Sequence, residues 1–344
     1  MTRRRLFAGS RYSQGFSLIE LMVSLTIGLV IALASFAAYI GIAGASKMAE
    51  AQGRMNEDAE AALTILTQQL RMAGNNPDQT NRVDNLNPTL SSRRNPVYQG
   101  GYALVSGEFT PALFTLSSFT IRGCDGTFSN IQAAGNIDSL TCAAGVNALS
   151  DSLAVSYEAD IFNTVPVASV APAALWPTDC IGNRLTTNTA TLPAVDLVGN
   201  KFSDTVTYAV ADNRFYIGSS ASVPSLFCQG NGIGSTATAL VENVEDMQLT
   251  YGATASGTTV AGYLRADQIL SEPTILAPLA NNAARWQKVL SVRICVLVRS
   301  ENPVVSDAAS AQYFRCDGTL EASPPDLRLR RAYSTTVVLR NRQL

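Results

Sequence analysis

The chain has 344 residues, of which only 15% are charged, and it contains no histidine. The absence of histidine excludes Ser-His-Asp and Cys-His catalysis and removes the commonest transition-metal ligand. Four of the 25 basic residues precede residue 16, which leaves 21 basic against 27 acidic residues in the rest of the chain. This mildly acidic balance argues against a general nucleic-acid-binding surface, and we expect a non-enzymatic protein without a cofactor.

The N-terminus combines a basic stretch with a long apolar run. Residues 1–15 carry four arginines and no acid, and residues 16–46 contain a single charge, Glu20. More than 18 consecutive apolar residues are enough to span a bilayer. A lone carboxylate in such a segment costs several kcal/mol, so an intramembrane Glu is expected to have a function.

Three interpretations of this segment compete. The apolar run is too long for an ordinary secretory signal, and it lacks an Ala-x-Ala cleavage site at a suitable distance. An uncleaved signal anchor explains the run but not Glu20. The third interpretation starts from Gly15-Phe16-Ser17-Leu18-Ile19-Glu20, which resembles the cleavage motif of type IV prepilins.

The resemblance implies a specific processing route. A membrane-bound prepilin peptidase would cut after Gly15 and N-methylate Phe16, and the apolar helix would be retained. Cleavage creates a cationic amine four residues before Glu20. In a filament of packed helices, Glu20 of one subunit could neutralise the Phe16 amine of its neighbour, because pairing makes a buried charge tolerable.

The helix is expected to continue beyond the membrane. No proline occurs between Phe16 and Pro77, and apolar residues recur at steps of three and four after Lys47. We therefore divide the chain into a basic leader (1–15), a membrane and filament-core helix (16–46), an amphipathic half-helix (47–76) and a β-rich periplasmic head (77–344).

The head is predicted to be an antiparallel β structure. Residues 77–101 look irregular, and β-rich runs follow at 113–121, 152–158, 288–298 and 332–340. Residues 205–217 predict a hairpin with its turn at Ala211-Asp212-Asn213. Residues 239–251 predict a helical turn that leads into a strand. The expected fold class is α+β: a long helix packed on a mainly antiparallel sheet, with a large insertion at 123–200.

Six cysteines lie in the head, all after the apolar segment. None is close enough to another for a CxxC motif, so the even number favours disulfides in an oxidising compartment. Six cysteines permit fifteen pairings, and buried free thiols remain the alternative. The sequential pairing closes the shortest loops and is favoured: Cys124 with Cys142, Cys180 with Cys228, and Cys295 with Cys316.

Two further groups of charged residues are candidate binding sites, one acidic and one basic. Asp151, Glu158 and Asp160 could bind calcium, but they lack the spacing of an EF-hand. The C-terminus is basic and could contact DNA phosphates, although a solvated strand face or a patch that docks an acidic partner is favoured. Its arginines are Arg328, Arg330, Arg331, Arg340 and Arg342.

The resemblance to prepilins extends into the head with lower specificity. The segments 208–210, 240–246, 251–252, 286–294 and 333–342 are similar to minor pilins of the PilW type and to the related J-type pseudopilins. The similarity is strong over 15–45, patchy over 205–344 and absent over 77–200.

The family implies a role and a set of partners. The role is that of a low-abundance subunit in a priming or tip complex. The partners are the prepilin peptidase, other minor pilins, the major pilin, the inner-membrane assembly machinery and membrane lipid, with nucleic acid less favoured. The location is the inner membrane, with one span and a periplasmic head, and the pilus tip after assembly. The alternatives are a type II secretion pseudopilin and a tip adhesin or DNA-binding subunit.

Overall fold

The computed structural model describes residues 15, 17–75, 101–112, 120–132, 137–143, 150–168, 174–195, 198–276, 279 and 282–342. The expected leader before Gly15, Phe16, all but the last residue of the irregular segment 77–101, and most of the predicted strand 113–121 lie outside these residues. The chain divides into two compact units, one that ends at Glu50 and one that begins at Ala51.

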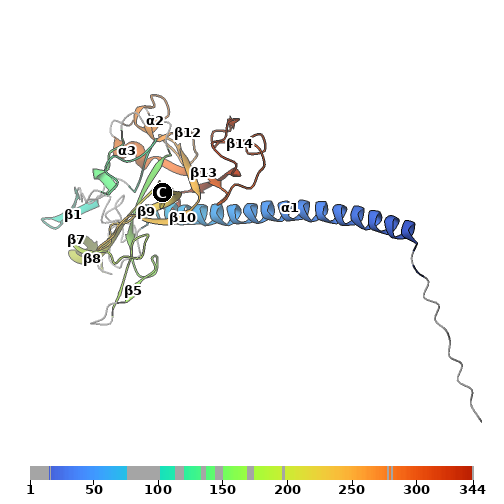
Figure 1. Ribbon diagram of the computed structural model, residues 1–344. Helices are drawn as coiled ribbons and strands as arrows, with labels where there is room; N and C mark the ends of the chain where they lie inside the picture. The colour runs from blue at the N-terminus through green and yellow to red at the C-terminus, as the bar shows by residue number, and fades with distance from the viewer. Residues whose placement is uncertain are drawn as a thin grey trace, which may run out of the picture. The chain divides into compact units, whose positions relative to one another are not determined.

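One long helix, α1, spans Leu18–Met72 (Figure 1). It ends four residues before the predicted limit at Asn76 because the chain turns at Gly74, which has a φ of +70°. A positive φ is favourable for glycine and commonly terminates a helix. Pro77 is therefore not what stops the helix. The Gly74 amide leaves the helix axis and donates to the Ser156 carbonyl at 3.0 Å.

The second unit uses one face of α1 as part of its core. The buried helix residues follow steps of three and four: Met55, Ala59, Ala62, Leu66 and Leu70. These steps place the side chains in one stripe along the helix, as the amphipathic pattern predicts. The stripe belongs to the same hydrophobic cluster as the inner faces of the two main sheets.

The first main sheet has six strands. Its order is β10-β9-β8-β4-β3, and β7 also pairs with β8 (Figure 1). Every pairing in it is antiparallel. The strands are β3 (Ile121–Cys124), β4 (Ser152–Ala159), β7 (Thr187–Val195), β8 (Lys201–Ser220), β9 (Val223–Gln229) and β10 (Thr238–Glu242).

The second main sheet has four antiparallel strands in the order β12-β11-β13-β16. They are β11 (Val244–Ala253), β12 (Gly262–Leu264), β13 (Val289–Arg299) and β16 (Arg330–Val338). Strand β13 lies between β11 and β16, and it is almost entirely buried. Its run of Val, Ile and Leu is typical of a strand that is covered on both faces. These strands confirm the prediction of a mainly antiparallel α+β fold.

Short elements complete the described part of the head. They are the two-stranded pairs β1 (Gly101–Val105) with β2 (Glu108–Ala112), β5 (Val167–Ala168) with β6 (Leu175–Trp176) and β14 (Tyr313–Phe314) with β15 (Leu320–Glu321), the helices α2 (Ala266–Ser271) and α3 (Asn282–Gln287), and the 3₁₀ turns η1 (Ile137–Ser139) and η2 (Arg340–Arg342).

The predicted hairpin at 205–217 is wrong, because β8 runs through it without a turn. The supposed turn residues are buried and have partners in the head. Asn213 donates to Gln69 Oε1 of α1 at 2.8 Å, and its own Oδ1 accepts from the Cys180 amide. Asp212 pairs with Arg214 at 3.3 Å. The real turn is at Ala221 and Ser222, which both have positive φ values.

The predicted helical turn at the start of 239–251 is also wrong. The segment forms β10 and β11, which are separated by Asn243 with a φ of +63°. Asn tolerates this left-handed conformation better than most residues. The Asn243 carbonyl then accepts from the Arg299 amide at 3.0 Å. A single Asn therefore transfers the chain from one main sheet to the other.

The segment 123–200 is not simply an insertion on the surface of the head. It contains β4 and β7, which both pair directly with β8 and belong to the six-stranded sheet. All eight residues of β4 are buried. This segment therefore supplies part of the framework of the head, although its sequence shows no resemblance to the pilin family.

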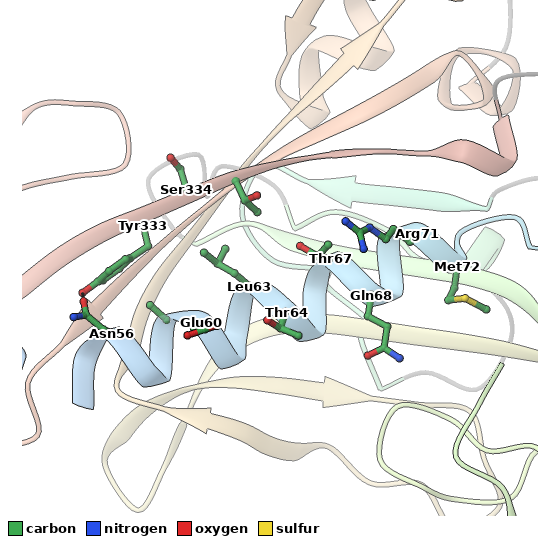
Figure 2. A pocket seen from close by; sticks show the side chains of 12 residues that line it. Asn56, Glu60, Leu63, Thr64, Thr67, Gln68, Arg71, Met72, Tyr333 and Ser334 are labelled. Atoms are coloured by element: carbon green, nitrogen blue, oxygen red, sulfur yellow. Dashed lines mark hydrogen bonds between the residues drawn. The ribbon is translucent and has the colours of Figure 1, made fainter. Parts of the chain in front are cut away.

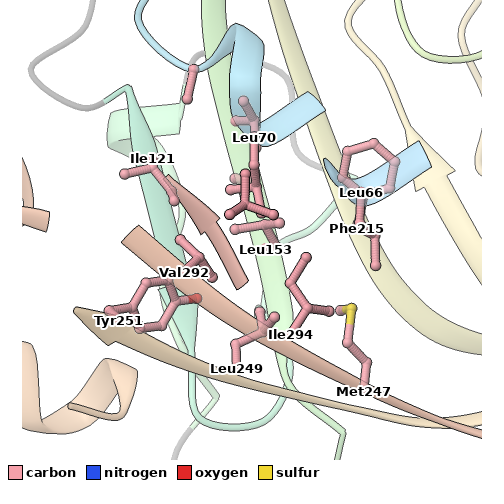
Figure 3. Close-up of a cluster of buried hydrophobic side chains, with 14 of the residues drawn as sticks. Leu66, Leu70, Ile121, Leu153, Phe215, Met247, Leu249, Tyr251, Val292 and Ile294 are labelled. Atoms are coloured by element: carbon pink, nitrogen blue, oxygen red, sulfur yellow. The ribbon is translucent and has the colours of Figure 1, made fainter. Parts of the chain in front are cut away.

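The core joins both sheets to α1 (Figure 3). Leu66 and Leu70 of α1 lie beside Ile121, Leu153 and Phe215 of the six-stranded sheet, and Met247, Leu249, Val292 and Ile294 come from the four-stranded sheet. Trp286 is 1% exposed and packs edge-on against Tyr251, with ring centroids 4.8 Å apart. Trp286 is therefore a core residue.

All six cysteines form disulfides in the sequential pairing that the sequence favours. Cys124 bonds Cys142, Cys180 bonds Cys228, and Cys295 bonds Cys316. The sequence separations are 18, 48 and 21 residues, so the second bond closes the longest loop. It holds the turn before β7 against the end of β9.

A buried carboxyl group makes the stability of the head depend on pH. Asp151 accepts from the Leu249 amide at 2.7 Å and from the Gly126 amide at 3.1 Å. Burial raises the pKa of Asp151 to about 7, although these two amides and the nearby Asp125 and Asp246 also act on it. Because the folded state keeps the proton that the unfolded chain has already lost, stability falls as the pH rises from about 4 to about 7.

Asp151→Asn is expected to remove this pH dependence. Ionisation of the wild-type group costs up to about 4 kcal/mol at high pH, since each unit of pKa shift corresponds to about 1.4 kcal/mol. Asn stays neutral but loses one of the two amide bonds. The variant should therefore be clearly less stable than the wild type at pH 5, and the gap should shrink or reverse at pH 8. Denaturant unfolding at both pH values measures this, and a gap independent of pH would contradict it.

Candidate functional site

The first unit presents an apolar surface. The part of α1 from Leu18 to Ile42 carries large hydrophobic side chains that are mostly more than half exposed; Leu18, for example, is 80% exposed. Exposed apolar patches of this size mark interaction with a membrane or with other proteins. Among the described residues, α1 is the one helix long and apolar enough to cross a membrane.

The predicted processing and assembly residues lie at the beginning of this helix. Gly15 is exposed, and a Cβ added to it would have open space around it. Glu20 lies exposed in the first turn of α1. Phe16 lies outside the described residues, so the proposed pairing between its amine and Glu20 remains a prediction.

Sequence reasoning missed the role of Ser17. Its Oγ accepts a hydrogen bond from the Glu20 amide at 3.2 Å, so Ser17 caps the N-terminus of α1. The spacing Ser17-x-x-Glu20 is that of a capping box, which could have been read from the sequence. A carboxylate in the first turn also interacts favourably with the helix dipole. Glu20 therefore has a local role at the helix start beside its proposed role in assembly.

The second unit contains a groove between α1 and β16 (Figure 2). Its volume is about 800 Å³. One wall is a flank of α1 next to the buried stripe, and the other is formed by Tyr333, Ser334 and Thr335 of β16. At one end the Tyr333 hydroxyl lies 2.6 Å from Asn56 Oδ1, and beyond the strand Asn341 Nδ2 donates to the Arg71 carbonyl at 3.0 Å. The helix and the strand therefore run in the same direction along the groove.

The C-terminal arginines do not form one basic surface. Arg330 is buried, and its guanidinium binds Glu245 at 2.6 Å and Asp326 at 2.7 Å. Arg328 is half-buried and contacts Asp326 at 3.3 Å. Arg331 and Arg340 are exposed, and the side chain of Arg342 lies outside the description. This arrangement leaves fewer cations for DNA than the sequence suggests.

The acidic residues considered for calcium do not come together. Asp151 accepts backbone amides in the core, whereas Asp160 caps a turn by accepting from the amides of Phe162 and Asn163. No group of three or more potential metal ligands occurs in the described part of the chain. Asp151 and Asp160 are thus already used by backbone donors.

The glycine-rich segment 230–234 is a packed loop. Gly230 and Gly232 are buried, and a Cβ on either would overlap Asp179, at 2.2 and 2.7 Å respectively. Asp179 Oδ2 accepts from the Gly232 amide at 2.9 Å, and its Oδ1 accepts from the Asn183 amide at the same distance. These glycines permit a close approach of two loops.

Two known families match the chain, one near its N-terminus and one in its C-terminal part. Residues 10–36 match the prokaryotic N-terminal methylation motif, and residues 214–341 match the family described as Type IV Pilus-assembly protein W. The second match includes the entire four-stranded sheet and the groove wall on β16. No curated protein and no solved structure matches the chain.

The methylation motif coincides with the start of the exposed apolar helix, which suits a membrane-anchored subunit. The second match lies in the head, which carries three disulfides. The methylation motif implies processing by a prepilin peptidase. Together, the methylation motif and the match of residues 214–341 to the type IV pilus-assembly protein W family, PilW, identify the chain as a pilin of the type IV pilus assembly system.

Proposed function

We propose that this pilin is a minor subunit that joins other minor pilins in a complex at the pilus tip, where it primes assembly. The observation that carries this proposal is the bulk of the head. From Ala51 onward the chain forms one compact unit built on a six-stranded and a four-stranded sheet. A head of this size is large for a subunit that repeats along a thin filament, whereas a cap or primer occurs once.

In this proposal the N-terminal segment carries both the cleavage site of the chain and its membrane anchor. The peptidase cuts between Gly15 and Phe16 and methylates the new amine. The helix from Leu18 to Ile42 first holds the subunit in the inner membrane and then packs among the helices of the filament. Glu20 neutralises the amine of an adjacent subunit, and the head stays in the periplasm until the tip is extruded.

Analysis of native pili and of the mature chain tests the proposal. Mass spectrometry should find an N-terminus at methylated Phe16. Purification of the full chain from its own cells should recover other minor pilins, and immunogold labelling should mark one end of sheared pili. Labelling along the whole filament, or a chain that still begins at Met1 or Thr2, would contradict the proposal. Recovery of secretion pseudopilins instead would favour the type II secretion alternative.

A further inference from the structure

Strand β16 forms one edge of the four-stranded sheet. Its partner β13 covers one side, and no other described strand pairs with it. The register between β13 and β16 runs from Ser291–Val338 to Arg299–Arg330 without a shift. An exposed edge of this length carries a row of backbone donors and acceptors that can pair with another chain.

The hydrogen bonds at the two ends of β16 show which of its backbone amides and carbonyls point away from β13. The Leu339 amide donates to the Leu290 carbonyl, and the Leu329 carbonyl accepts from the Ser300 amide, both at 2.8 Å. Odd-numbered residues therefore point their backbone groups toward β13. Alternate residues in an antiparallel strand point the other way. The outward-facing amides and carbonyls belong to Ala332, Ser334, Thr336 and Val338.

A strand added to this edge would lie over the groove beside α1. The groove spans the helix from Asn56 to Met72, which corresponds to about 24 Å of α-helix. A strand of about seven residues has the same length. The helix flank offers the new strand an apolar strip of the half-buried Leu63 and Met72, edged by the exposed polar Thr64 and Gln68. One further strand paired to β16 would therefore cover this flank of α1.

The charges around the groove indicate which side chains a strand bound at this edge should carry. Arg331 and Arg340 are exposed near the two ends of β16, and Arg71 lines the groove on the helix side, against one acidic lining residue, Glu60. Antiparallel pairing of two β16 strands centred near Thr335 would gather Arg331 of one copy and Arg340 of the other at each end of the pair. Like charges gathered at both ends repel each other. A second copy is therefore a poor partner, and a strand with acidic side chains near its ends is a good one.

We propose that the outer edge of β16 accepts an extended segment from the head of a different pilin subunit, which carries acidic residues and continues the four-stranded sheet over the flank of α1. This inference rests on the proposed function, because it needs a complex with other pilins. It deepens that function by naming the surface that binds the partner and the chemistry of the segment that is bound.

Hydrogen exchange on the full-length chain tests the strand addition. The chain is purified in detergent, alone and together with the pilins that copurify with it, and exchange is followed in peptides covering 330–342. The complex should slow exchange at the outward-facing amides at least tenfold relative to the chain alone. Equal rates would overturn the inference while leaving the proposed function intact, and failure to recover any pilin complex would overturn both. Slow exchange already in the isolated monomer, or in a dimer that forms with rising concentration, would also overturn it.

A matched pair of variants at Ser334 adds a second test. Ser334→Pro removes one outward-facing donor without touching the ladder to β13, and proline is tolerated on edge strands. Ser334→Ala keeps the amide. We expect the proline variant to lower recovery of the pilin complex at least tenfold and the alanine variant to leave it unchanged, with slow exchange in β13 as the check of folding. Charge reversal in Arg331→Glu/Arg340→Glu should reduce recovery similarly, and equal recovery in all variants would overturn the inference.

Discussion

Glu20→Gln is expected to leave leader cleavage at the wild-type level and to lower recovery of the chain in pilin complexes at least tenfold. Gln has the same length as Glu and a similar helix propensity. The bond from the residue 20 amide to Ser17 Oγ comes from the backbone and is kept. The variant therefore removes the charge and preserves the start of α1. A tenfold loss corresponds to about 1.4 kcal/mol, which is less than the roughly 2.5–3.5 kcal/mol that an unpaired charge costs in hydrocarbon on insertion scales.

Ser17→Ala is the matched control for this prediction. It removes the side chain that caps α1 and keeps the carboxylate of Glu20. Loss of an N-cap costs about 1 kcal/mol of helix stability, which a helix as long as α1 can absorb. We expect near-normal incorporation of the Ser17 variant. If Ser17→Ala impaired incorporation as strongly as Glu20→Gln, the helix start and not the charge pair would be responsible.

Mass spectrometry and copurification separate the two steps in the same cells. The mature N-terminus reports cleavage, and the amount of partner pilin that copurifies reports incorporation. A Glu20→Gln chain that is cleaved and incorporated normally would remove the argument for a charge pair. A chain that is no longer cleaved would show that Glu20 acts in recognition by the peptidase.

The features that sequence alone predicted depend on local patterns. The apolar run and the stripe from Met55 to Leu70 are both set by spacing along one helix. The disulfide pairing also followed from short separations. Strands β13 and β16 were predicted nearly in full because their β-branched residues form continuous runs.

The errors occurred where distant residues satisfy polar groups. Asn213 is a typical turn residue, yet it lies in the middle of β8 because its side chain binds Gln69 and the Cys180 amide. Gln69 is 144 positions away from Asn213, so no window of sequence contains the cause. The groove beside β16 was unpredictable for the same reason, since it depends on which strand lies at the sheet edge and on where α1 runs.

Loss of the Cys180–Cys228 disulfide is expected to cost more stability than loss of either other bond. The bond closes a loop of 48 residues, and the loops of the others span 18 and 21. In the chain-entropy description, a bond across 48 residues contributes about 4 kcal/mol and the shorter ones about 3 kcal/mol each. Cys180→Ala/Cys228→Ala should therefore lower the free energy of unfolding by about 4 kcal/mol.

Hydrogen bonds near the Cys180–Cys228 disulfide affect how the head responds when this bond is removed. The Cys180 amide donates to Asn213 at 3.0 Å, and the adjacent Asp179 binds the Gly232 amide at 2.9 Å. The first contact ties the Cys180 loop to β8, and the second ties it to the loop that follows Cys228, so both remain when the bond is absent. They act only in the folded state, whereas the disulfide also restricts the unfolded chain. The hydrogen bonds therefore preserve the local structure of the variant without restoring its stability.

Denaturant unfolding of the full-length chain in detergent measures the effect through two tryptophans. Trp286 lies in the core beside Tyr251, and Trp176 lies in β6 close to Cys180. Coincident transitions from both probes would show that the head still unfolds as one unit. An earlier transition at Trp176 alone would mean that the bond stabilises only its own loop. The variant Cys295→Ala/Cys316→Ala is the control. An equal or larger loss of unfolding free energy in the control would contradict the predicted ranking, because loop length would then not govern the contribution of these bonds.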